Sequence, residues 1–225
     1  MIASLVKDKM NYVIPTTVVD NFFEDPIAIR KYALSLDYEL DPEGRWPGKR
    51  SKNLHIINRG LFDNICEKFF SLFYDVENDE NLRWTVKAAF QLTDSSYEEG
   101  WVHSDLSLIS AVIYLNDNPD PNTGTTIYKP KTVGTKMLHT EEKIRQIRNK
   151  NNGNYRKENN EQFEESIIIK NKFNRLVAFD GYSYHGANMF EGSTEETSRL
   201  TLVFFVEELR GNKYPIQKLR TIVYE

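Results

Sequence analysis

The spacing of apolar residues changes along the chain, and the predicted elements change with it. In the first third, an apolar stripe at helical spacing follows Asp25-Pro26, and a second one covers residues 60–75. Val, Ile and Thr are frequent before them, at 11–20, where we expect a short strand. Residues 1–81 are therefore predicted to form a mainly helical N-terminal buttress.

From Leu82 onward, apolar residues recur at every second position, which is the period of a strand with one buried face. The first such strand places Trp84, Val86, Ala88, Phe90 and Leu92 on one side. Further strands are expected at 106–115, 125–128, 166–169, 176–180 and 199–206. Turn residues separate several of these runs and no periodic helix intervenes, so the pattern favours an antiparallel sandwich or barrel.

A polar insert interrupts the strands at about 133–165, where we expect a long loop with a short helix at its start. Within it, residues 143–157 carry six basic side chains and no acid. Such a segment could contact nucleic acid, but acids on both sides nearly cancel its charge, which favours a solvated loop.

Composition limits the classes to which the protein can belong. A chain of 225 residues, 40% of them hydrophobic, can bury a core, and its formal charge of −4 does not suit a basic module that coats polyanions. The single cysteine, Cys66, excludes a disulfide-stapled scaffold and a multi-cysteine zinc site. Without a long apolar run or a signal-peptide pattern, we expect a cytoplasmic protein with no membrane partner. Because no repeat or flexible linker divides it, residues 1–225 are predicted to form one domain, ending in an extension at 211–225.

Three polar residues have the chemistry of a metal site. His103 and Asp105 stand two residues apart, so in extended backbone both side chains project from one face. His185 follows the predicted strand at 176–180 after a Gly turn. Two imidazoles and a carboxylate form the facial set that holds iron(II) with open positions, although zinc accepts the same ligands. Taken one at a time, these residues also fit a polar strand end and a satisfied core histidine.

A buried anion site is suggested by the strand at 199–206. Arg199 and Thr201 share one face of it, while Leu200, Leu202 and Phe204 occupy the other. A guanidinium at the head of an apolar strand is costly to bury unless it meets an anion, such as a carboxylate that also accepts from the threonine hydroxyl. The alternative is a surface arginine paired with Glu195 or Glu196.

The order of these motifs, His-x-Asp, a strand leading to a distal His, and then Arg-x-Thr, resembles the iron(II)- and 2-oxoglutarate-dependent dioxygenases, closest to their prolyl-hydroxylase-like branch. Three further runs are similar to strands of that branch: 113–116, 123–128 and 175–179. Thr123, Thr125 and Ile113 depart from it, because they replace a Gly, a Glu and a Tyr whose hydroxyl would bind the distal carboxylate of the cosubstrate.

The resemblance implies a mainly β fold with flanking helices (α+β), in which residues 82–210 form a double-stranded β-helix core of the jelly-roll, cupin-like type. It implies an Fe(II) ion held by His103, Asp105 and His185. The cosubstrate 2-oxoglutarate would chelate that ion, with its C5 carboxylate on Arg199 and Thr201, and O2 would take the last position. The implied reaction hydroxylates a C–H bond of a protein side chain or small molecule and releases succinate and CO2; nucleic acid is the less favoured substrate.

Four residues are candidates for substrate contacts near the mouth of such a site: Gln91, Trp101, Tyr128 and Asn188. Core or rim packing is the alternative for each of them. The other two histidines, His55 and His139, are expected at surface or loop positions. The alternative to an oxygenase is a non-catalytic or degenerate metal-binding β-barrel that acts as a binding or structural module.

Overall fold

The computed structural model describes residues 14–132 and 153–211, and its largest element is a seven-stranded sheet. The strands follow the order β1-β8-β5-β10-β4-β3-β2, and all neighbours are antiparallel. Their bounds are β1 Thr17–Val19, β2 Glu39–Leu40, β3 Lys49–Arg50, β4 Arg83–Thr93, β5 Ile109–Tyr114, β8 Leu176–Asp180 and β10 Arg199–Arg210.

A smaller sheet packs against this one. It contains β7 (Phe163–Ile169), β6 (Thr125–Pro130) and β9 (His185–Ala187) in that order, again antiparallel. An isolated bridge joins His103 to His185 at the free side of β9. From β4 to β10 the chain passes repeatedly from one sheet to the other, which is the winding of a jelly roll. The predicted class, mainly β with flanking helices around a jelly-roll core, is confirmed.

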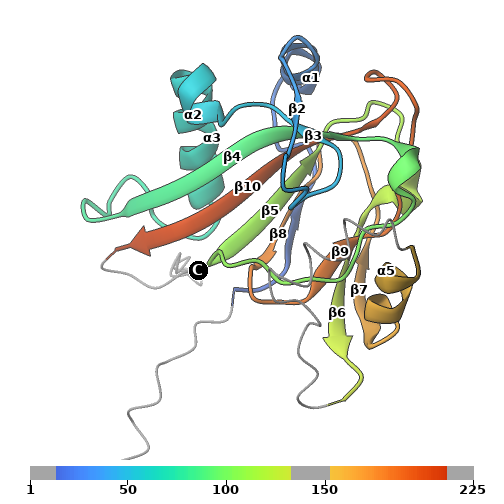
Figure 1. Ribbon diagram of the computed structural model, residues 1–225. Helices are drawn as coiled ribbons and strands as arrows, with labels where there is room; N and C mark the ends of the chain where they lie inside the picture. The colour runs from blue at the N-terminus through green and yellow to red at the C-terminus, as the bar shows by residue number, and fades with distance from the viewer. Residues whose placement is uncertain (1–13, 133–152, 212–225) are drawn as a thin grey trace, which may run out of the picture.

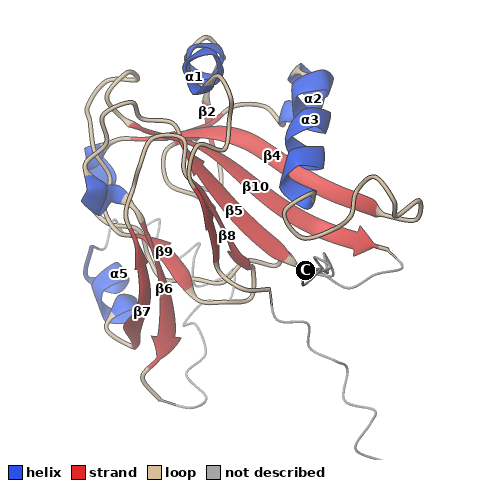
Figure 2. Cartoon of the chain, turned by 180° about the vertical axis from the view of Figure 1, so that it is seen from behind, coloured by secondary structure: helices blue, strands red, loops and turns tan. Residues whose placement is uncertain are grey.

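Helices cover only one face of the large sheet (Figures 1 and 2). These are α1 (Pro26–Leu34), α2 (Leu54–Ile57) and α3 (Arg59–Phe70), whereas α5 (Gly153–Asn160) lies beside the small sheet. Two short 3-10 turns cover Ser95–Tyr97 and Pro121–Thr123. The start of α1 was predicted correctly: Pro26 opens it, and the Asp25 carboxylate accepts a bond from Ala28 N at 2.9 Å.

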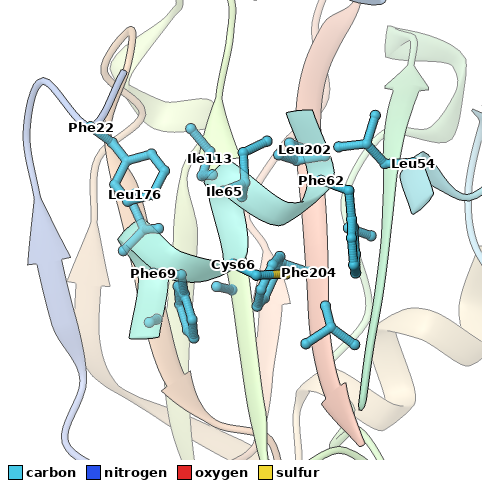
Figure 3. Close-up of a cluster of buried hydrophobic side chains, with 14 of the residues drawn as sticks. Phe22, Leu54, Phe62, Ile65, Cys66, Phe69, Ile113, Leu176, Leu202 and Phe204 are labelled. Atoms are coloured by element: carbon cyan, nitrogen blue, oxygen red, sulfur yellow. The ribbon is translucent and has the colours of Figure 1, made fainter. Parts of the chain in front are cut away.

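The main core lies between the helices and the large sheet. From β10 it receives Leu200, Leu202 and Phe204, and α3 places Phe69 against them, with the Phe69 and Phe204 ring centroids 4.5 Å apart (Figure 3). The opposite face of the sheet meets the small sheet through a smaller apolar cluster: Tyr114, Ile127, Ile169, Val177 and Phe179. One face of each central strand is therefore packed by helices, and the other faces the interior of the jelly roll.

The structure corrects the prediction for the polar insert. Residues 133–152, with His139 and most of the basic run 143–157, lie outside the described residues, as does the short helix expected there. The remainder is not a loop, because α5 begins at Gly153 and β7 already at Phe163. Backbone pairing with β6 forms β7, although most of its side chains are exposed, Ile167 and Ile168 among them. A polar sequence therefore does not exclude a strand here.

The N-terminal region contains more than helices. Sequence patterns missed β2 and β3, since strands of two residues have no period. His55 lies on α2, with its ring centroid 5.7 Å from that of Phe62, and not in a loop. Within 14–132 and 153–211, no helix combines the length and the apolar character needed to cross a bilayer.

Candidate metal centre

His103, Asp105 and His185 come together at one end of the jelly roll. Each offers one ligand atom, and these atoms all lie within 4.8 Å of one another. The Asp105 carboxylate stands between the imidazoles, with Oδ2 3.3 Å from His185 Nε2 and Oδ1 3.6 Å from His103 Nε2. The sequence-based grouping of the three residues therefore has the geometry of a metal site.

Backbone pairing builds this arrangement. His103 N donates to His185 O at 2.9 Å, and His185 N donates to His103 O at 2.8 Å. Asp105 N donates to Gly181 O at 2.8 Å, which ties the carboxylate to the turn before β9. A Cβ at position 181 would lie 2.1 Å from Ser107 O, so only glycine permits this close approach.

Both imidazoles present Nε2 to the centre. His103 Nδ1 donates to Trp101 O at 2.9 Å, and His185 Nδ1 donates to Ser183 O at 2.8 Å. Because a carbonyl only accepts, each Nδ1 carries a proton, and the two bonds turn Nε2 of both rings toward the point where an ion would bind. The Ser110 hydroxyl on β5 donates to Asp105 Oδ2 and holds the carboxylate in place.

The ionisation states also suit a cation. Burial and, to a smaller extent, the neighbouring His185 lower the pKa of His103 to about 4, so His103 is neutral at pH 7. Burial raises the pKa of Asp105, but the contact with His185, the proximity of His103 and the bond from the Ser110 hydroxyl outweigh this and hold that pKa well below its usual range. A neutral imidazole of His103, the ring of His185 and the carboxylate of Asp105 thus face one point.

Helix α5 holds the strand segment that carries His103. The side chain of Asn160 accepts from Val102 N at 2.8 Å, and that of Asn159 donates to Val102 O at 2.9 Å. Asn160 also donates to Gly100 O, and Arg156 donates to Glu99 O and Tyr97 O. These side chains take the place of a further strand at this edge. No sequence pattern identified them, because the segment resembled a solvated loop.

Arg199 and Thr201 lie on one strand face, as alternation predicted, and the structure places that face inside the jelly roll. Arg199 is only 5% exposed, and its Nε donates to Thr123 O at 2.8 Å. Among the described residues, no carboxylate lies within salt-bridge distance of its guanidinium, so the alternative of a surface arginine paired with Glu195 or Glu196 is wrong. The Thr201 hydroxyl is fully buried and finds no hydrogen-bond partner there.

Sequence analysis did not identify Tyr114 as a neighbour of Arg199. Its ring centroid lies 5.3 Å from the Arg199 guanidinium carbon, and its hydroxyl donates to Thr125 Oγ1 at 2.7 Å. The resemblance had directed attention to Ile113, which points into the helix-packed core instead. Strand alternation could have found Tyr114, since it pairs with Thr201 across β5 and β10.

The four substrate candidates occupy different positions. Gln91 is buried opposite Thr201 and bonds Arg50 and Pro47 O, whereas Trp101 supplies the carbonyl that orients His103. Tyr128 is half-buried on β6, and burial raises its pKa. Asn188 follows β9, donates from its backbone to Gly124 O at 3.1 Å, and has a buried side-chain oxygen without a partner in the described part of the chain. Whether any of them contacts a substrate stays a prediction.

Comparison with known proteins gives a family and several similar structures. Residues 6–206 match the family model described as "Family of unknown function (DUF6445)". No curated protein matches the chain.

Among solved structures, the chain is similar to HygX from Streptomyces hygroscopicus with nickel and 2-oxoglutarate bound, at 15% identity and a TM-score of 0.49 over 85% of this chain and 82% of that one. It is also similar to a Pseudomonas putida prolyl-4-hydroxylase, at 14% identity and a TM-score of 0.42 over 92% and 99%. Because these values are low, the function has to be argued from the residues of the chain itself.

Proposed function

The chain belongs to this family of unknown function, DUF6445, and we propose that it is an iron(II)- and 2-oxoglutarate-dependent oxygenase. Membership of the family does not name a reaction, so the proposal rests on the residues of the chain. The observation that carries the proposal is the combination, inside one jelly roll, of a His-Asp-His cluster and a buried arginine without a carboxylate partner among the described residues. A dicarboxylate that chelates a metal through one end would satisfy both.

The donor set fits iron(II). His103, Asp105 and His185 would supply two neutral nitrogens and one carboxylate oxygen, which leaves positions for further ligands. Zinc accepts these donors as well, so the metal itself has to be measured. The Nδ1 bonds to carbonyl oxygens support a resident ion, because such bonds orient ligand imidazoles in metal sites.

The anion end fits the C5 carboxylate of 2-oxoglutarate. Arg199 Nε donates to Thr123 O, and the guanidinium also interacts with Tyr114, but it has no ion pair with a carboxylate among the described residues and could bind one from a ligand. The Thr201 hydroxyl lies on the same strand face and is a buried donor without a partner in the described chain. A paired contact to the guanidinium plus one hydroxyl bond would offset the cost of burying both groups.

The residues of the chain would bind and orient the reactants. His103, Asp105 and His185 would hold the ion, while Arg199 and Thr201 would fix the cosubstrate along the interior of the jelly roll. Phe179, whose ring centroid lies 4.4 Å from that of His185, would exclude water beside the ion. Bound iron(II) supplies the oxidative chemistry, in which 2-oxoglutarate, O2 and R–H become succinate, CO2 and R–OH.

The test combines metal binding with turnover of the cosubstrate. Purified protein should bind one iron(II) ion per chain and convert 2-oxoglutarate to succinate slowly without added substrate. His185→Ala should remove both properties while near-UV circular dichroism stays like that of the parent, and His55→Ala on α2 should leave both unchanged. Iron binding without any succinate would overturn the oxygenase and favour the non-catalytic metal-binding module instead.

A further inference from the structure

Arg50 on β3 is a second guanidinium without an ion-pair partner among the described residues, although the charges of Asp105 and Asp41 act on it. Its Nε donates to Gln91 Oε1 at 2.9 Å, and no ion pair joins its guanidinium to a carboxylate among the described residues. Burial lowers the pKa of Arg50 to about 10, so the group is charged at pH 7. The neighbouring cations differ from Arg50 in having a carboxylate partner: Lys49 pairs with Glu195, and Arg45 pairs with Asp41.

The side chain of Arg50 is held in a fixed position. Its guanidinium carbon stands 4.2 Å from the ring centroid of Trp46, which places the cation over the indole face. Gln91 cannot rotate freely below it, because its Nε2 donates to Pro47 O at 2.7 Å. Gly48 has a φ of +72°, and a Cβ there would lie 2.0 Å from Leu92 O, so glycine lets this segment lie flat on β4.

The unpaired polar groups around Arg50 are N–H donors that have no acceptor among the described residues. Within the described residues, Arg50 donates through Nε alone, so its terminal N–H groups have no acceptor there. Trp46 Nε1 is also buried without a partner there. A fixed cation with a free planar fork is the arrangement that recognises carboxylate or phosphate groups.

Strand pairing places this cation on the side of the metal centre. The backbone of Arg50 pairs with Gln91, but its guanidinium carbon reaches to 5.5 Å from the ring centroid of Phe205. Phe205 pairs with Ser110, the residue that bonds Asp105. The charge of Asp105 also raises the pKa of Arg50, against the effect of burial, which agrees with this direction.

We propose that Arg50, supported by Trp46 and Gln91, binds an anionic group of the substrate, a carboxylate or a phosphate, beside the metal centre. The substrate class is thereby an anionic molecule and not a neutral one. This inference rests on the proposed oxygenase function. Arg199 and Thr201 already provide for the distal carboxylate of the cosubstrate, and Arg50 comes from β3, outside the strands β4 to β10 that form the jelly roll.

The experiment uses NMR titration of the metal-free protein with inorganic phosphate and, separately, with acetate. The indole N–H signal of Trp46, assigned with Trp46→Phe, reports binding. We expect that one of the two anions shifts this signal in a saturable way, which also identifies the preferred group. Arg50→Met should weaken that affinity at least about tenfold, and Arg50→Lys several-fold, since lysine keeps the charge but loses the fork.

Two matched variants make the assignment specific. Lys49→Met removes a neighbouring positive charge from the same strand, and Arg199→Met removes the other unneutralised guanidinium; both should leave the Trp46 titration within about twofold of the parent. The proposal is overturned if neither anion shifts the signal, if Arg50→Met titrates like the parent, or if only Arg199→Met loses the shift. It is also overturned if saturating 2-oxoglutarate with diamagnetic zinc(II) abolishes the anion effect, because Arg50 would then belong to the cosubstrate site.

Failure here is distinct from failure of the proposed function. The titration needs neither iron nor turnover, whereas the oxygenase is tested by iron binding and succinate. If iron binding and succinate formation are normal but no anion affects the Trp46 signal, the anionic substrate is refuted and the oxygenase is not.

Discussion

The two faces of the central strands β4, β10 and β5 differ in what they contain. On the helix side, Leu202 and Phe204 pack within the main hydrophobic cluster. On the interior side, the same strands carry Arg199, Thr201 and Ser110, all buried. The first face lowers the free energy of the fold, and the second buries polar groups at a cost that a bound metal and anion would offset. Strand alternation thus directs the larger apolar cluster to the helix side, while the interior side combines a smaller apolar cluster with the polar residues of the candidate site.

The largest effect should come from the helix side. Phe204→Ala removes an aromatic ring packed against Phe69, and we expect the free energy of unfolding to fall by about 3–5 kcal/mol. Urea denaturation monitored by circular dichroism measures this loss. A loss below about 1 kcal/mol would mean that the helix-packed core is not what stabilises the sheet.

Substitutions on the interior side should change ligand affinity much more than the free energy of unfolding. Arg199→Met should weaken 2-oxoglutarate binding at least about thirtyfold, because the C5 carboxylate loses a paired contact with a buried cation. Anaerobic calorimetry on metal-loaded protein measures the affinity. Iron affinity should barely change, and the unfolding free energy should fall much less than in Phe204→Ala. An unchanged 2-oxoglutarate affinity would contradict the anion site.

A smaller effect is expected from α5, which lies at the edge of the small sheet. Asn160→Ala removes the acceptor for Val102 N and the donor to Gly100 O, so the segment before His103 loses part of its support. We expect iron(II) affinity to fall about tenfold, as for other residues that orient metal ligands.

The matched control for Asn160→Ala is Gln162→Ala, whose side chain donates only to Glu158 O within the described residues. Its iron affinity should equal that of the parent. Equal losses in both variants would indicate a general effect of the helix and not orientation of His103.

The smallest effect should come from Thr201→Val, which replaces a buried hydroxyl without a described partner by a methyl group. We expect 2-oxoglutarate affinity to fall about threefold to tenfold, from the loss of one hydrogen bond. The unfolding free energy should stay the same or rise slightly, since a buried polar group is removed. A clear destabilisation would show that the interior face also contributes to the stability of the fold.

The central strands and the metal residues could be predicted because their signals are local. Alternation in β4 and β10 separates apolar from polar positions, and β8 coincides with the run expected at 176–180. His103 and Asp105 share a face because they are two residues apart in the chain. Such patterns depend on backbone geometry, which is the same wherever a strand occurs.

Other features depend on residues far apart in the sequence. Arg50 and Gln91 meet only because β3 pairs with β4, and Val102 finds Asn159 and Asn160 only when α5 folds against that edge. No local pattern marks a strand of two residues or an asparagine whose partner is distant. The sequence by itself therefore determined most of the jelly-roll strands, the candidate ligand set, and the fact that Arg199 and Thr201 share one strand face. The tertiary structure decided which buried cations are neutralised and which side chains orient the ligands, because both depend on contacts between distant segments.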